Sequence, residues 1–295
     1  MTVTRAEEIQ TPSRRRQPST AGRGRGGVRL VWWWELRKLA AQRRTALTAM
    51  VCLVAPLAAA FVLDAQASVP KDTLYGRWVH TSGFAVSLLL LGFAGQWLFP
   101  LLTSIVAGDI FASEDGQGTW KTVLTRSRSR GQIFVGKALA AATFAVLAVT
   151  LFALSSLAGG LLVVGRQPLV SLSGTLLPAD RMMALVLASW ASTLLAVLAF
   201  TALGLLLSVA ARNSVVGVGG PVVIGLLMSV LSLLGGLDLF RHLLLTEPFS
   251  AWHGLLSDPP FYGLLTRGAL VSLGYLVACL GLAWVLFRRR DVTGG

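Results

Sequence analysis

The chain has 295 residues, of which 54% are hydrophobic and 13% are charged, and it carries a net charge of +13. Soluble domains typically contain about 25% charged residues, so this composition excludes an ordinary soluble domain. The long apolar runs are apolar on every face, whereas the strands of a membrane barrel alternate apolar and polar residues. The sequence therefore predicts an all-α integral membrane protein.

The N-terminal segment divides into two parts. Residues 1–28 are rich in Arg, Gly, Ser, Thr and Pro and lack apolar periodicity, which predicts a disordered basic tail. Residues 29–44 carry apolar side chains at helical spacing, which predicts an amphipathic helix lying in the membrane interface. A plain extension of the first span is the alternative. The residues expected to position this interfacial helix are Trp32, Trp34, Glu35 and Lys38.

Six uncharged apolar runs are long enough to cross a hydrocarbon core about 30 Å thick, which needs roughly 20 residues per helix. We predict one six-span domain over residues 29–290 and a short C-terminal tail at 291–295. The spans are expected at about 46–63, 83–107, 138–164, 183–210, 214–237 and 268–287.

Two later segments carry further signals. Small residues and a proline at the start of the fifth span, from Gly217 to Pro221, predict a kink or a close contact between helices. The fifth connection, about 238–267, is too apolar for a solvated loop and too interrupted for a span. It predicts a pair of short re-entrant or interfacial helices.

The basic residues gather in alternate connections. Most of the 26 lysines and arginines lie in residues 1–45, in the second connection or at the end of the chain. By the positive-inside rule these segments face the cytoplasm, so both termini are expected inside a multi-pass protein of a bacterial cell membrane. Because topology accounts for the positive charge, we expect the lipid bilayer as a partner and no nucleic acid.

The spans offer little chemistry of their own. Ion-coupled transporters usually keep ionisable residues at membrane depth, and these spans contain none. We therefore expect no catalytic residue, metal or cofactor in this chain, and any energy for transport must come from a partner. An integral-membrane enzyme, such as a lipid transferase, is the weakest alternative. Its only candidate residues are His242, Glu247, His253 and Asp258.

The richest polar segment, residues 108–131, joins the second and third spans. It begins acidic, ends basic and contains apolar residues that a solvated loop would not need, which is typical of a surface that docks a soluble protein. The residues expected at this docking surface are Asp109, Phe111, Glu114, Gly118, Trp120, Arg126 and Arg130.

A partial phosphate-loop pattern follows this segment. Gly131 is followed after four residues by Gly136 and Lys137, but Ala138 replaces the hydroxyl residue that would bind magnesium. No strand precedes the pattern. We expect Lys137 instead to extend along the apolar helix toward the inner membrane face.

The run from Ala107 through Glu114, Gly118 and Arg130 to Lys137 resembles the loop between spans two and three in type-2 permease subunits of ATP-binding cassette (ABC) exporters. The segment 34–39 is similar to the interfacial elbow helix of that family, and the basic ending at 288–290 is similar to its C-terminal signature. Ser127 stands where many members carry proline.

The resemblance implies a permease that forms the substrate pathway as a dimer, with a second copy or a paralogue. A separate ATPase subunit would bind ATP and Mg and dock on a coupling helix in the loop 108–131. The remaining alternative is a membrane anchor or assembly factor that recruits a cytoplasmic protein through the same loop and transports nothing.

Overall fold

The computed structural model describes residues 25–68, 73–118, 129–233 and 241–289. Within these residues six helical stretches are long and apolar enough to cross a membrane, which confirms the predicted number of spans. They are α2 (Arg43–Ala65), the pair α3 (Gly83–Phe93) and α4 (Phe99–Ala107), α7 (Arg130–Val163), α8 (Ala179–Ala211), α9 (Ser214–Leu233) and α11 (Gly263–Arg288).

Two helices begin earlier than the sequence predicts. Helix α1 (Arg25–Ala40) includes residues 25–28, which were assigned to the disordered tail; residues 1–24 lie outside the described part of the chain. Helix α7 starts at Arg130 and not at 138, because Ser129 and Gln132 form a reciprocal capping box that fixes its first turn. This early start places Lys137 inside a helix.

The second span is interrupted at mid-length. Between α3 and α4 lies a π-helical turn, η2 (Ala94–Leu98), and Pro100 follows it in the first turn of α4. Proline has no backbone N–H, so it cannot make the regular helical hydrogen bond to Gln96 four residues earlier. The widened turn that results is of the kind often found at functional sites.

Helices α7 and α8 form the centre of the bundle. Helix α7 packs against α1, α2 and α3, while α8 packs against α4, α9 and α11. Their core contains the rings of Phe99, Phe152 and Trp190, whose centroids lie 5.7–6.2 Å apart. In the most apolar part of α2, α9 and α11 only 22% of the residues are buried, so the apolar side chains of these helices are available to lipid.

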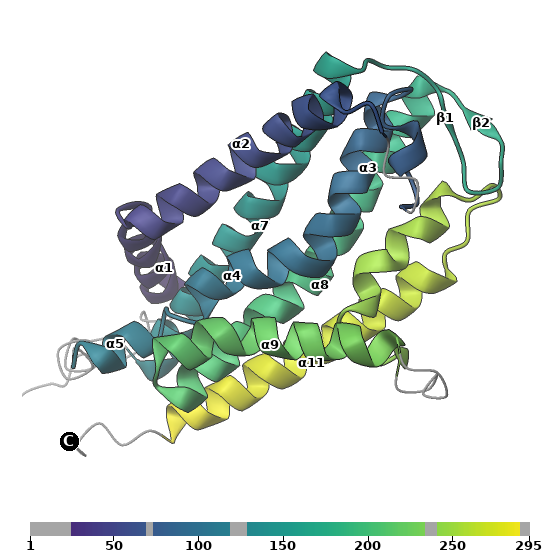
Figure 1. Ribbon diagram of the computed structural model, residues 1–295. Coiled ribbons are helices and arrows are strands. Elements are labelled where there is room, and N and C mark those ends of the chain that lie inside the picture. Colours follow the sequence, from purple (N-terminus) through teal and green to yellow (C-terminus); the bar gives the residue numbers. More distant parts are fainter. Residues whose placement is uncertain (1–24, 69–72, 119–128, 234–240, 290–295) are drawn as a thin grey trace, which may run out of the picture.

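The bundle has two distinct ends (Figure 1). One end, called here the α1 end, holds α1, the short helix α5 (Ala112–Gly116) and the last turn of α11. The opposite hairpin end holds β1 (Leu169–Val170) paired antiparallel with β2 (Leu176–Leu177). Two 3-10 helices, η1 (Gly76–Trp78) and η3 (Glu247–Leu256), complete the described elements.

The fifth connection folds against the bundle. Its described part contains η3, which packs on α8 and α11 and buries Phe249 and Trp252. The prediction of a short helix in this apolar connection is confirmed for η3. Residues 234–240, where a second short helix would fall, lie outside the described part of the chain.

Candidate functional site: a buried ion-pair network

A buried lysine joins three elements at the α1 end. Lys137 of α7 has a side chain that is only 1% exposed, and its Nζ lies 2.9 Å from Glu35 Oε1 on α1 and 3.2 Å from Glu114 Oε1 on α5. The same Nζ donates a hydrogen bond of 3.1 Å to the carbonyl oxygen of Ile110. These three acceptors use the full donor capacity of an ammonium group.

The prediction that Lys137 extends to the membrane face is therefore wrong. The lysine lies in the second turn of α7, and the loop that follows α4 covers it, so its charge is neutralised inside the protein. The residues of the partial phosphate-loop pattern, Gly131 to Lys137, are all helical. A phosphate loop needs backbone N–H groups that are free, and a helix interior uses them.

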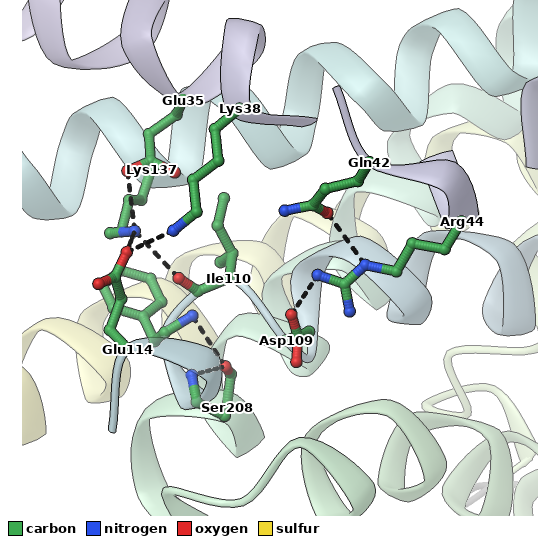
Figure 2. A network of polar contacts seen from close by, with 11 residues as sticks. Glu35, Lys38, Gln42, Arg44, Asp109, Ile110, Glu114, Lys137 and Ser208 are labelled. Atoms are coloured by element: carbon green, nitrogen blue, oxygen red, sulfur yellow. Dashed lines mark hydrogen bonds and ion pairs between the residues drawn. The ribbon is translucent and has the colours of Figure 1, made fainter. Parts of the chain in front are cut away.

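A second lysine completes a four-group network, shown in Figure 2. Lys38 of α1 donates a hydrogen bond of 2.6 Å to Glu114 Oε1, the same oxygen that faces Lys137. Lys38 lies three residues after Glu35, so the two share one face of α1. The network thus contains two carboxylates and two ammonium groups. Removal of only one partner from a buried ion pair strongly destabilises a protein, because the other charge is left buried and unpaired.

One oxygen of the network has no partner. Glu35 Oε2 is buried and makes no hydrogen bond with any described residue. Lys38, one helical turn from Glu35, bonds instead to Glu114.

A separate ion pair fixes the start of the loop. The guanidinium of Arg44, in the first turn of α2, donates a hydrogen bond to Asp109 Oδ2. Burial by itself would raise the pKa of Asp109, but hydrogen bonds from Arg44, Ser214 and Ser113, with the charge of Arg44, hold that pKa below its usual value. Asp109 is consequently ionised at neutral pH and connects α2 to the beginning of α9.

The loop backbone lies directly on two helices. The hydroxyl oxygen of Ser208 on α8 accepts hydrogen bonds from the N–H groups of Phe111 (3.2 Å) and Ala112 (3.0 Å). Gly108 lies so close to Gly217 of α9 that a Cβ on either glycine would overlap the backbone of the other. The predicted close contact at Gly217 is confirmed, and the residue that Gly217 contacts is Gly108, where α4 ends and the loop begins.

Phe111 does not present its ring to a partner protein. Its side chain is fully buried, with ring centroids 5.6 Å from Phe134 on α7 and 5.3 Å from Phe287 on α11. The prediction of an exposed apolar anchor is wrong for this residue, because the bundle itself supplies the apolar surface. The ring instead fastens the loop to α7 and α11.

The other predicted site residues fall into three groups. Gly118 is exposed and has a φ of 63°, a left-handed conformation that glycine adopts without strain. Arg130 donates a hydrogen bond of 2.8 Å to the carbonyl oxygen of Arg288, joining α7 to the end of α11. Trp120 and Arg126 lie outside the described part of the chain.

The tryptophans of α1 face in different directions. The indole N–H of Trp32 donates a hydrogen bond of 3.1 Å to the hydroxyl of Thr143 on α7. Trp34 is 61% exposed, and Trp33 beside it is 49% exposed. The apolar face of α1 thus packs on the bundle, while two large indole rings remain at its surface.

A depression opens beside the network. Its volume is about 490 Å³, and its wall includes Lys38, Arg44 and Asp109 together with Ser113 and Gln117 of the loop. These side chains come from α1, α2 and the residues around α5. The depression is therefore lined by three of the segments that form ion pairs at the α1 end, namely α1, α2 and the loop, and not by the fourth, α7.

Three of the four residues considered for an enzymatic site, His242, Glu247 and His253, line one cavity together with Arg267, and His242 Nδ1 lies 3.0 Å from an Arg267 nitrogen. Asp258 does not line this cavity and lies 3.8 Å from Arg181. Among residues 25–68, 73–118, 129–233 and 241–289, no group of three or more His, Cys, Asp or Glu side chains could hold a metal ion.

The six long apolar helices, of which α7 and α8 are the two at the centre, define an all-α membrane protein. The chain belongs to the family described as protein of unknown function DUF2705, whose model matches residues 57–293. The matched region includes the loop and α7, whereas Glu35, Lys38 and Arg44 precede it. A search of curated proteins found no match.

Proposed function

We propose that this chain is the permease subunit of an ABC transporter of the exporter class, with the α1 end facing the cytoplasm of a bacterial cell. The orientation is supported by the positive-inside rule, because α1, the first turns of α2 and α7 and the last turn of α11 lie at this end and carry Arg29, Arg37, Lys38, Arg43, Arg44, Arg130 and Arg288. Two permease subunits, identical or paralogous, enclose the substrate pathway.

The observation that carries the proposal is the ion-pair network around Glu114. Glu114 is held by Lys38 of α1 and Lys137 of α7, and Asp109 is held by Arg44 of α2. A force applied to the loop 108–118 is therefore transmitted to three helices through charged contacts. A loop that served only as a connection would not need to bury Asp109 and Glu114 against basic side chains of three helices.

The network also has the property of a switch. Glu35 Oε2 has no hydrogen-bond partner among the described residues, and Lys38 is placed to pair with either Glu35 or Glu114. We propose that Lys38 exchanges Glu114 for Glu35, which would make the network a bistable element that an external contact can bias. We propose that an ATPase subunit, which alone binds ATP and Mg, docks at the depression beside Lys38 and shifts this balance.

The experiment is reconstitution in lipid vesicles with ABC ATPases encoded near the gene of this chain. For the cognate ATPase we expect its hydrolysis of ATP to rise several-fold when the chain is present. Glu114→Ala should abolish most of this stimulation. Asp64→Ala, which removes an exposed acid at the hairpin end of α2, should leave it intact.

Two outcomes would contradict the proposal. If none of the ATPases changes its rate in the presence of the chain, the permease assignment is wrong. If an ATPase binds the chain but no solute that the complex recognises moves across the vesicle membrane, the anchor or assembly-factor alternative holds.

A further inference from the structure

A cavity of about 330 Å³ lies toward the hairpin end, away from the ion-pair network. Its walls come from α3, the π-helical turn η2, the end of α9, and the 3-10 helix η3. Ligand pockets in proteins typically measure about 300–1,000 Å³, so this cavity is large enough for a small organic molecule. The π-helical turn contributes Gln96 and Trp97 to its lining.

Three buried polar groups without partners gather in the walls of this cavity. Tyr75, Thr246 and Trp252 are each less than 8% exposed, and the Tyr75 hydroxyl, the Thr246 hydroxyl and the Trp252 indole N–H make no hydrogen bond with any described residue. They are half of the six such atoms in the described part of the chain. Each such group loses its hydrogen bonds to water on folding without replacing them, which is destabilising.

This concentration indicates a binding surface. Folded proteins pair nearly all of their buried polar groups, so an unpaired group needs a specific explanation. The three atoms are buried and belong to residues that line the cavity. A ligand that carries an oxygen acceptor satisfies the indole N–H, which can only donate.

The charge of the lining favours a cation. Glu247 contributes a carboxylate that forms no ion pair with any described residue, and the described residues of the lining include neither lysine nor arginine. Burial lowers the pKa of His253, which keeps its imidazole uncharged at neutral pH. Arg241, in the fifth connection, does not line the cavity and donates to the carbonyl oxygen of Ser232 in the last turn of α9.

The remaining walls are largely aromatic. Tyr75 and Trp252 are stacked with ring centroids 6.3 Å apart, and further rings come from Phe93, Trp97 and Phe249. Aromatic faces attract organic ammonium groups, and the attraction increases when water is excluded. A carboxylate among such rings is selective for a positively charged organic group over an uncharged one of the same shape.

We propose that this cavity binds a small organic ammonium compound with an apolar body and an oxygen acceptor, and that this is the substrate class of the transporter. Glu247 and the surrounding rings hold the ammonium group. The indole N–H of Trp252 donates to the oxygen, and the hydroxyl of Tyr75 or Thr246 supplies a second donor. The assignment as a transport substrate rests on the proposed function, whereas binding itself does not.

The test uses the full chain in nanodiscs of phosphatidylcholine and equilibrium dialysis, with binding to protein-free nanodiscs subtracted. One probe is choline phenyl ether, which has a quaternary ammonium group, an ether oxygen and a ring. The other is its uncharged isostere, 3,3-dimethylbutyl phenyl ether. We expect the wild type to bind the cation about tenfold more tightly than the isostere.

Matched variants identify the groups responsible. Glu247→Gln should reduce the preference for the cation to within about twofold. Asp180→Asn, which changes an exposed acid at the same end of the bundle but outside the cavity, should leave the preference unchanged. Trp252→Phe should weaken both probes by a similar factor, because it keeps an aromatic ring and removes one donor to the oxygen that both probes share.

Equal binding of the two probes to the wild type would overturn the proposal, and this result does not depend on whether any variant folds. An equal loss of preference in Glu247→Gln and Asp180→Asn would also overturn it. Because the assay contains no ATPase, a negative result leaves the coupling mechanism standing. If the chain fails to stimulate an ATPase, in turn, this result does not contradict the proposal that the cavity binds a cation.

Discussion

Lys137 on α7 and Glu35 on α1 form an ion pair of 2.9 Å in which the lysine side chain is 1% exposed and the glutamate side chain 13%. The contact joins the helix that precedes the first span to the helix of the third span. Transfer of both charges out of water is costly, and their attraction offsets this cost only where the geometry is favourable. The pair therefore specifies how α1 sits on the bundle.

We expect Lys137→Met to destabilise the protein by about 3–5 kcal/mol, because it leaves Glu35 and Glu114 buried without their shared counterion. Thermal unfolding in detergent, followed by tryptophan fluorescence, measures the change. In the double variant Lys137→Met with Glu35→Gln, part of this loss should be recovered. Simple addition of two destabilising effects would show that the two charges do not interact.

The contact between Gly108 and Gly217 gives a second prediction. A methyl group at position 217 would overlap the carbonyl oxygen of Gly108, so Gly217→Ala should cost about 1–3 kcal/mol. Gly219→Ala, on the same helix, meets no atom within 4 Å of the added Cβ and should be neutral or slightly stabilising. The same unfolding assay compares the two; equal effects would mean that the loop does not lie against α9.

Asp109 makes a prediction about pH. Its pKa is lower in the folded protein than the usual 3.8, so the folded state binds the proton less readily than the unfolded state. The contribution of its ionised form to stability is thus fully present above the unfolded-state value and declines as pH falls toward the lower folded-state value. Compared with Asp109→Asn, the wild type should be more stable by about 1–3 kcal/mol at pH 5–7.

This advantage should shrink below about pH 4, the usual range for an aspartate. The stability difference between the wild type and Asp109→Asn is measured by unfolding both from pH 7 to pH 3 in a detergent without ionisable groups. The exposed Asp64 serves as a control, since Asp64→Asn should show no pH-dependent difference from the wild type. A stability gap at Asp109 that widened on acidification would contradict the assigned direction of the pKa.

The spans could be predicted from the sequence because hydrophobic length is a local property. Each of the six apolar runs is long enough to cross the bilayer irrespective of its neighbours. The start of α7 was also readable, since Ser129 and Gln132 have the spacing of a capping box. That signal would have placed Lys137 inside the helix, in its second turn.

The network could not be predicted in the same way, because Glu35, Glu114 and Lys137 come from distant parts of the sequence. A basic residue beside an apolar run is ordinarily read as one that reaches the membrane surface. Phe111 presented a similar ambiguity: an aromatic ring in a polar loop suits either a partner or the chain's own core. Only the packing of Phe134 and Phe287 decides between them.

Lys38 offers a way to separate coupling from stability. Its side chain is 42% exposed, so its ion pair with Glu114 contributes little to folding, about 0–1 kcal/mol. In the proposed mechanism, however, Lys38 is the group that moves between Glu114 and Glu35. We expect Lys38→Ala to leave the unfolding temperature nearly unchanged while reducing the stimulation of the ATPase several-fold.

Arg43→Ala is the matched control, because it removes an exposed positive charge from the same end of the bundle without touching the network. Both variants are measured in the same vesicles, for unfolding and for ATP hydrolysis. If the two variants reduce stimulation equally, the loss reflects the overall positive charge of this surface. If Lys38→Ala has full activity, the exchange of partners between Glu114 and Glu35 is not part of the mechanism, and force must reach the helices through Lys137 and Arg44 alone.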